Sequence, residues 1–321
     1  PEHHFAARVG KEFSEGAHRV NFMQTGVFRS ADRDSVGDYD SRDAWTSAAD
    51  FDLNFHDRDY NIRGSFVGSA VDPAPFESDP EAPHRRIYGT GGRLAVRKVG
   101  GAFMGGISGR WETDKLDLND AGFLSAPDEM NGGGWLRYEH NADDSDALVV
   151  RGHVGLDLSK SWFYAGRTGY DRDTGEEIWS YERGHPTGMF VGLNSSTQFR
   201  NFWHVWCGGG WEPSASAKYA TRGFEDPDGE YVRGPLMKYP SSVWGWLGFN
   251  TDYRKPLAFN VDLNAGGNER GAWNRRISVG ADWTATDVMT YDLSVSYRRS
   301  HSEAQHLDNF ENPGGGIGGV S

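Results

Sequence analysis

The chain has 321 residues and a formal net charge of −13, from 33 Lys and Arg against 46 Asp and Glu. This acidic balance excludes nucleic acid as the expected partner, because phosphate contacts need clustered Lys and Arg. The mean hydropathy is −0.67, and no run approaches the roughly 18 consecutive apolar residues that a membrane helix needs, so a helical membrane protein is excluded. The single cysteine, Cys207, excludes an internal disulfide framework and a cysteine-based zinc cluster.

Segments in which apolar and polar residues alternate follow one another along the chain, and this period of two predicts β-strands. They come in pairs joined by short turns, so we expect hairpins. The paired segments are 4–13 and 18–29, 44–55 and 59–71, 89–99 and 101–113, 134–141 and 147–165, 187–198 and 200–212, 242–253 and 256–266, and 272–284 and 287–300. The total is about fourteen strands or a few more, and single-chain bacterial barrels have an even number.

The clearest alternation lies between residues 273 and 297. Its apolar face contains Ile277, Val279, Leu293 and Val295, which lie between aromatic residues. The first strand runs from Trp273 to Trp283, and ten steps of roughly 3.3 Å at a tilt of about 40° span about 25 Å. That is the height of the apolar band on an outer-membrane barrel. We therefore expect these apolar side chains to contact lipid.

The connections between the expected strands alternate between short turns and long polar loops. The long loops are 30–43, 72–88, 114–133, 166–186 and 213–241. Short periplasmic turns and long outer loops are typical of outer-membrane barrels, whereas a soluble all-β fold, the alternative, has no reason to alternate them. The sequence thus predicts an all-β, antiparallel up-and-down transmembrane β-barrel in the bacterial outer membrane.

The polar positions of these strands would line the lumen of the barrel. They include Asp50, Asp52, Asp262, Arg276, Asp282 and Asp292. An acidic lumen would favour cations. At about fourteen strands the interior is too wide to be filled by wall side chains, so we expect it to hold water or an inserted loop.

Two loop segments carry a family resemblance. The segment Leu118-Asn119-Asp120-Ala121-Gly122-Phe123-Leu124, followed by Asp128, resembles the Asn-Asp-x-Gly-Phe-Leu segment of an uncharacterised bacterial outer-membrane barrel family. The segment Arg233-Gly234-Pro235-Leu236-Met237 is similar to the Arg-Gly-Gly-Pro-Leu segment of that family, with one Gly fewer. The resemblance implies an outer-membrane barrel and supplies no activity.

In that family the barrel often follows a carbohydrate-binding, family-nine-like domain. We therefore expect residues 1–321 to form a single barrel domain without its N-terminal periplasmic domain. Residues 302–321 are expected to be a Gly-rich loop or tail.

Candidate chemistry is sparse. Asp171 and Asp173 are spaced like the start of a calcium loop, but the remaining ligands are missing, so a turn is favoured. Glu176, Glu177, Asp226 and Glu230 could pair as in glycoside hydrolysis, yet such pairs arise by chance in so acidic a chain. No zinc-protease, nucleophile-elbow or phosphate-loop motif occurs. We predict no enzymatic activity, no cofactor and no metal.

A group of tryptophans stands out in the last third of the chain: Trp203, Trp206, Trp211, Trp244 and Trp246. We interpret them as girdle or packing residues. The alternative is that Trp244 and Trp246, on the face opposite Val243 and Leu247, stack on a saccharide in the lumen.

The sequence as a whole predicts an outer-membrane barrel that acts as a pore, receptor or scaffold. The alternative is a secreted all-β protein that binds or cleaves carbohydrate. Expected partners are outer-membrane lipid, further copies of the chain through the barrel wall or outer loops, and a saccharide.

Overall fold

The computed structural model describes residues 2–29, 41–73, 86–118, 128–144, 146–170, 177–217, 224–225, 231–232, 237–302, 310–311 and 317–318. Every regular element in these ranges is a β-strand. No helix in the described part of the chain is long and apolar enough to cross a membrane.

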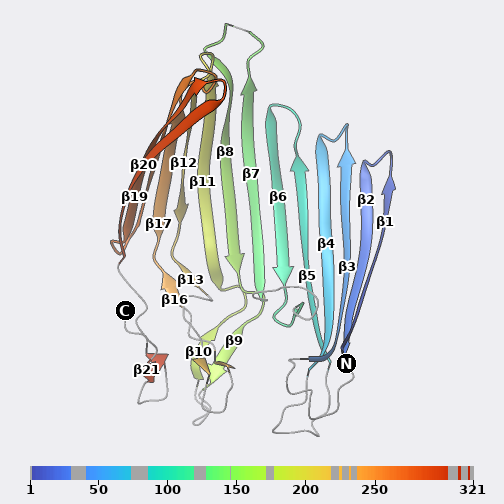
Figure 1. Ribbon diagram of the computed structural model, residues 1–321. Helices are drawn as coiled ribbons and strands as arrows, with labels where there is room; N and C mark the ends of the chain where they lie inside the picture. Colours follow the sequence, from blue (N-terminus) through green and yellow to red (C-terminus); the bar gives the residue numbers. More distant parts are fainter. Residues whose placement is uncertain are drawn as a thin grey trace.

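Fourteen strands form one antiparallel sheet in which each strand pairs with its neighbours along the chain (Figure 1). The first eight are β1 (Glu2–Phe13), β2 (His18–Arg29), β3 (Ser41–Phe55), β4 (Tyr60–Pro73), β5 (Ile87–Lys98), β6 (Phe103–Glu112), β7 (Glu129–Asn141) and β8 (Val149–Trp162). The remaining six are β11 (Pro186–Phe199), β12 (His204–Glu212), β17 (Ser242–Asn250), β18 (Leu257–Asn268), β19 (Trp273–Thr286) and β20 (Met289–His301). The predicted up-and-down order and the strand number are confirmed.

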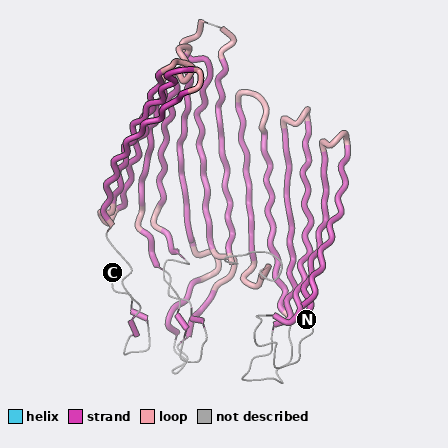
Figure 2. Tube along the Cα trace, in the orientation of Figure 1, coloured by secondary structure: helices cyan, strands magenta, loops and turns pink. Residues whose placement is uncertain are grey.

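The turns within the predicted hairpins lie at one end of the sheet and the long connections at the other, together with the short turn 269–272 between β18 and β19 (Figure 2). The long connections contain small two-stranded pairs: β9 (Arg167–Tyr170) with β10 (Glu177–Tyr181), β13 (Ala215–Ala217) with β16 (Met237–Tyr239), and β14 (Phe224–Glu225) with β15 (Tyr231–Val232). After β20, the predicted Gly-rich tail contains one further pair, β21 (Phe310–Glu311) with β22 (Ile317–Gly318).

The sheet is curved but open. β1 and β20 form its two edges (Figure 1), and no pairing between them occurs among the described residues. The sequence prediction of a closed barrel therefore differs from the structure in this one respect. Alternation specifies strands and their order, whereas closure depends on tilt and shear across the whole sheet.

Several predicted strands extended into turns, as 147–165 did beyond Trp162, and two others show the cause. The segment 200–203 is a turn in which Phe202 has a φ of 66° and the Trp203 amide donates to Asn201 Oδ1 at 3.1 Å. β17 ends at Asn250 because the next residues form a second turn, closed by the Asp252 carboxylate. Local side-chain hydrogen bonds ended both strands earlier than their apolar pattern suggested.

Burial on the two faces of the sheet is the reverse of that in a water-soluble protein. Polar side chains are buried on one face, where Asn61 is 4% exposed. Large apolar side chains are exposed on the other, where Ile107 is 69% and Val295 67% exposed. We call these the polar face and the apolar face. The apolar side chains predicted to contact lipid all lie on the apolar face, since Val279 pairs with Val295, Ile277 with Tyr297 and Ala281 with Leu293.

Candidate functional site

The polar face collects the residues that the sequence analysis assigned to the lumen. Directly paired residues share a face, and the register places the predicted set on this one: Asp50, Asp52, Asp262, Arg276, Asp282 and Asp292. They do not form one cluster. Asp50 and Asp52 lie on β3, whereas the others lie on β18, β19 and β20 at the far end of the sheet.

Asp50 and Asp52 are held in a hydrogen-bonded network with buried asparagines. Asn21 Nδ2 donates to Asp50 Oδ1 at 2.8 Å, and Asn61 Nδ2 donates to Asp52 Oδ1 at 2.6 Å. Arg97 donates to Asn61 Oδ1 from Nε and from its terminal nitrogen, at 3.2 and 2.6 Å. The network gives these buried amides their partners, and it fixes part of the polar face against β2, β4 and β5.

The sequence analysis missed the arginines between these two acidic regions. Cross-strand pairing from β4 to β8 places on the polar face Arg63, Arg93, Arg97, Arg110, Arg137 and Arg151. Acidic side chains share these strands and this face, namely Glu112, Glu129, Glu139 and Asp157, and Arg110 forms an ion pair with Glu129. The polar face therefore carries charges of both signs, whereas the sequence analysis expected an acidic lumen. Alternation already places Arg93 and Arg97 opposite Leu94 and Val96, whereas register shows that the arginines of different strands share one face.

Aromatic rings form a second feature of the polar face. Trp244 and Trp246 are stacked with centroids 5.2 Å apart and planes at 20°, and Phe190 is stacked on Trp244 at 5.8 Å and 14°. We call Phe190, Trp244 and Trp246 the aromatic platform. Trp206 shares the face, next to His204 at 5.1 Å. Trp203 and Trp211, which the sequence grouped with them, belong to the apolar side, because Trp203 contacts Phe249 and Trp211 pairs with Val243.

Glycines on the neighbouring strands make room for these rings. A Cβ on Gly208 would overlap the Trp246 ring, and one on Gly210 would overlap the rings of Phe190 and Trp244. Each ring thus lies against bare backbone, which is a known way to cover glycines in a sheet. Beside the platform, Asn194 pairs with Gly208 and donates to Asp157 Oδ2 at 2.8 Å. The arrangement offers aromatic surface next to a carboxylate and an amide.

The long connection after β6 folds back over the polar face. Leu116 is 2% exposed and lies over β5, where a Cβ on Gly89 would collide with it. The Asp117 amide donates to Ser69 Oγ on β4 at 3.1 Å. This stretch leads into the segment that carries the family resemblance. The motif residues themselves, Asn119, Asp120, Gly122, Phe123, Arg233, Gly234 and Pro235, lie outside the described residues, as do Asp171 and Asp173.

Three long connections meet at one point, which we call the loop junction. Asp128 is fully buried, and its Oδ1 accepts the Ala165 amide at 2.6 Å. Phe163, also fully buried, stacks with His185 at 6.3 Å. The His185 ring nitrogen Nε2 is hydrogen-bonded to Ser216 Oγ at 2.8 Å. The junction ties the connections after β6, β8 and β12 together. In the described part of the chain, no three His, Cys, Asp or Glu side chains come close enough to hold a metal ion.

Comparison with known families and proteins gives a limited result. Residues 11–165, slightly less than half of the chain, match the family described as a domain of unknown function (DUF5916). The match includes the first motif segment and Asp128 but ends before the second motif. No curated protein matches the chain.

One similar solved structure is the siderophore receptor PiuA from Acinetobacter baumannii, with a TM-score of 0.43 and 9% sequence identity. The alignment covers 99% of this chain and 58% of the receptor, so the chain spans little more than half of that protein's length. At this level of similarity the receptor gives no information about the ligand or activity of the chain.

Proposed function

We propose that the chain forms the wall of an outer-membrane β-barrel, with its apolar face in lipid and its polar face along an aqueous passage, and that it acts as a pore or receptor for polar solutes. The observation that carries this proposal is the reversed burial of the two faces. Soluble monomers rarely expose contiguous apolar patches above a few hundred Å², and this face crosses the whole sheet.

The dimensions and connections of the sheet support an outer membrane in particular. Rings lie at the ends of the apolar band, as in the stacked pair Trp283 and Tyr291, 5.6 Å apart at the short-turn end of β19 and β20. Amphipathic rings favour the headgroup layer. All long connections share one end, which is typical of barrels with short periplasmic turns and long outer loops.

Reconstitution tests this proposal directly. The chain should fold from urea into lipid vesicles, migrate differently on a gel before and after boiling, and conduct ions in a planar bilayer. A stable, monodisperse protein in buffer without detergent would contradict the proposal and favour the secreted carbohydrate-binding alternative.

A second candidate function, saccharide binding in the passage, is favoured by the aromatic platform. Sugar rings present apolar C–H faces that stack on aromatic rings and hydroxyl groups that hydrogen-bond to carboxylates and amides. The platform provides both, with Trp244 37% exposed and Asn194 and Asp157 beside it.

The test uses a panel of linear oligosaccharides and tryptophan fluorescence of the detergent-solubilised protein. W244A/W246A should abolish a saccharide-dependent signal, because it removes the two indole surfaces. Trp211→Ala is the matched control on the apolar face and should retain the signal. Equal responses from both variants would contradict a site at the platform.

A further inference from the structure

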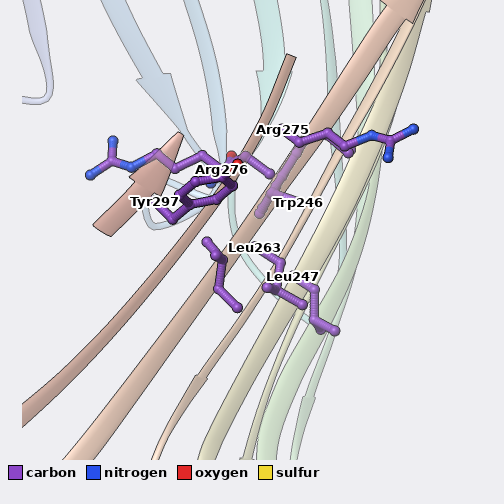
Figure 3. Close-up of a pocket in the computed structure, with 10 residues that line it drawn as sticks. Trp246, Leu247, Leu263, Arg275, Arg276 and Tyr297 are labelled. Atoms are coloured by element: carbon purple, nitrogen blue, oxygen red, sulfur yellow. The ribbon is translucent and has the colours of Figure 1, made fainter. Parts of the chain in front are cut away.

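The apolar face has a depression with a volume of about 470 Å³ across β17, β18, β19 and β20 (Figure 3). Its floor is made by small residues, Gly245 and Ala265, which pair directly across β17 and β18. On the side toward the strand centres, larger apolar residues line it: Leu247, Leu263, Ile277 and Tyr297. A groove results because the small row lies beside a row of bulky side chains.

The groove ends at Arg275, whose cross-strand neighbour on β20 is a second arginine, Arg299. Ala265 pairs with Arg275, and Arg275 pairs with Arg299 on β20, so both guanidinium groups belong to the apolar face. Both lie over the Trp273 ring, at 5.2 and 5.7 Å from its centroid. Figure 3 shows Arg275 and its neighbour Arg276 pointing in opposite directions.

Two positive charges opposite each other destabilise a sheet. Within the described residues no ion pair joins Arg275 or Arg299 to an acidic side chain. The arrangement stands out in a chain with a net charge of −13. An anion between the two guanidinium groups would remove the repulsion, and the planar guanidinium fork matches phosphate oxygens.

The depth of the pair also matters. Trp273 begins β19 at the end where the long connections lie, and Arg275 is two residues further along the strand. At roughly 3.3 Å per residue this places the Cα atom of Arg275 about 7 Å from the strand end, within reach of the headgroup layer for a long side chain. Ile277 and Leu263 continue the lining toward the centre of the apolar band, where acyl chains lie.

We propose that the groove binds a phosphorylated lipid of the outer leaflet, of the lipid A type. One phosphate lies between Arg275 and Arg299, and one acyl chain lies along Leu263 and Ile277. The inference rests on the proposed function, which assigns the apolar face to the membrane. The arginine pair separates this site from a second depression on the apolar face, where the ammonium group of Lys98 already donates to the backbone carbonyls of Gly100 and Phe103.

The test compares R275Q/R299Q with R276Q/R298Q. The second pair lies one residue along the same two strands but on the polar face. Arg276 also borders the depression, but its side chain points away from Arg275 (Figure 3) and its Nε donates to Ser296 Oγ at 3.2 Å. The charge change is therefore identical and only the face differs. Detergent-solubilised protein is titrated with lipid A, and the temperature at which the folded gel band is lost is measured. Dephosphorylated lipid A, phosphatidylglycerol and inorganic phosphate are tested in parallel.

Lipid A should raise this temperature for the wild type and for R276Q/R298Q, whereas R275Q/R299Q should need at least about tenfold more lipid. Dephosphorylated lipid A, phosphatidylglycerol and inorganic phosphate should each have a smaller effect on the wild type. An unchanged response in R275Q/R299Q, or an equal response to phosphatidylglycerol or inorganic phosphate, would overturn the lipid site alone. If R275Q/R299Q does not fold, the comparison of lipid A with dephosphorylated lipid A on the wild type still tests the lipid site.

Loss of the response in R276Q/R298Q only would show that the two faces are inverted. In that case the proposed function would be contradicted as well.

Discussion

An arginine at Val279 is the most direct probe of which face meets lipid. Val279 lies in the middle of β19, 45% exposed, with Val261 and Val295 as its cross-strand neighbours. An arginine facing lipid near the bilayer midplane costs roughly 2 to 4 kcal/mol, and near the interface about 0 to 1. Val279 is six residues from Trp273 and four from Trp283, so we expect the upper range.

The matched control is Ser278→Arg on the polar face. Ser278 Oγ donates to Ser296 Oγ at 2.9 Å, so this change removes one hydrogen bond, worth roughly 0.5 to 1.5 kcal/mol. Water in the passage would solvate the new guanidinium group. We therefore expect Val279→Arg to be the more destabilising of the two.

The assay is equilibrium folding from urea into lipid vesicles, followed by tryptophan fluorescence and by gel mobility before and after boiling. Val279→Arg should lower the free energy of unfolding by roughly 2 to 4 kcal/mol. A larger loss for Ser278→Arg would refute our assignment of the faces. Equal small losses of unfolding free energy in the two variants would contradict a membrane location, because both positions would then be in contact with water.

Three further measurements test the polar face, the loop after β6 and one turn. In single-channel recordings under a salt gradient, D50N/D52N should shift the reversal potential toward anion preference and R93Q/R97Q should shift it toward cation preference, because a low-dielectric wall focuses the field of fixed charges. Shifts of both variants in the same direction would contradict the charge assignment of the polar face. Deleting residues 118–128 should raise conductance while the folded gel band persists, because the preceding residues lie over the polar face; unchanged conductance would show that this loop lies outside the passage. In the turn after β17, the Arg254 hydrogen bonds lower the pKa of Asp252, so this contact stabilises the fold above the ordinary carboxyl pKa and is lost as pH falls through the lower folded value. The difference in urea midpoint between wild type and Asp252→Ala should therefore shrink in strong acid, and a difference that grows there would contradict it.

Much of the architecture could be predicted from the sequence because it depends on local pattern. The period of two along β19 and β20 specified two strands and the residues on each face, and turn residues such as Gly16 (φ 82°) marked where hairpins reverse. The alternation of short and long connections gave the up-and-down order. Each of these signals is contained within a few neighbouring residues, so no knowledge of distant contacts was needed.

The candidate functional features depended on register between strands as well as on alternation within each strand. The arginines of the polar face, the stacking of Phe190 on Trp244, and the pairing of Arg275 with Arg299 all arise from which residues lie opposite each other. In the sequence, Trp203 and Trp246 belong to one group of tryptophans, and only the sheet placed them on opposite faces. Alternation assigns each residue to one of two faces of its own strand, but the alignment of one strand on the next is set by turn geometry and by packing across the whole sheet. For that reason the sequence by itself determined the strands and their two faces, and the tertiary structure decided which side chains lie next to one another on each face.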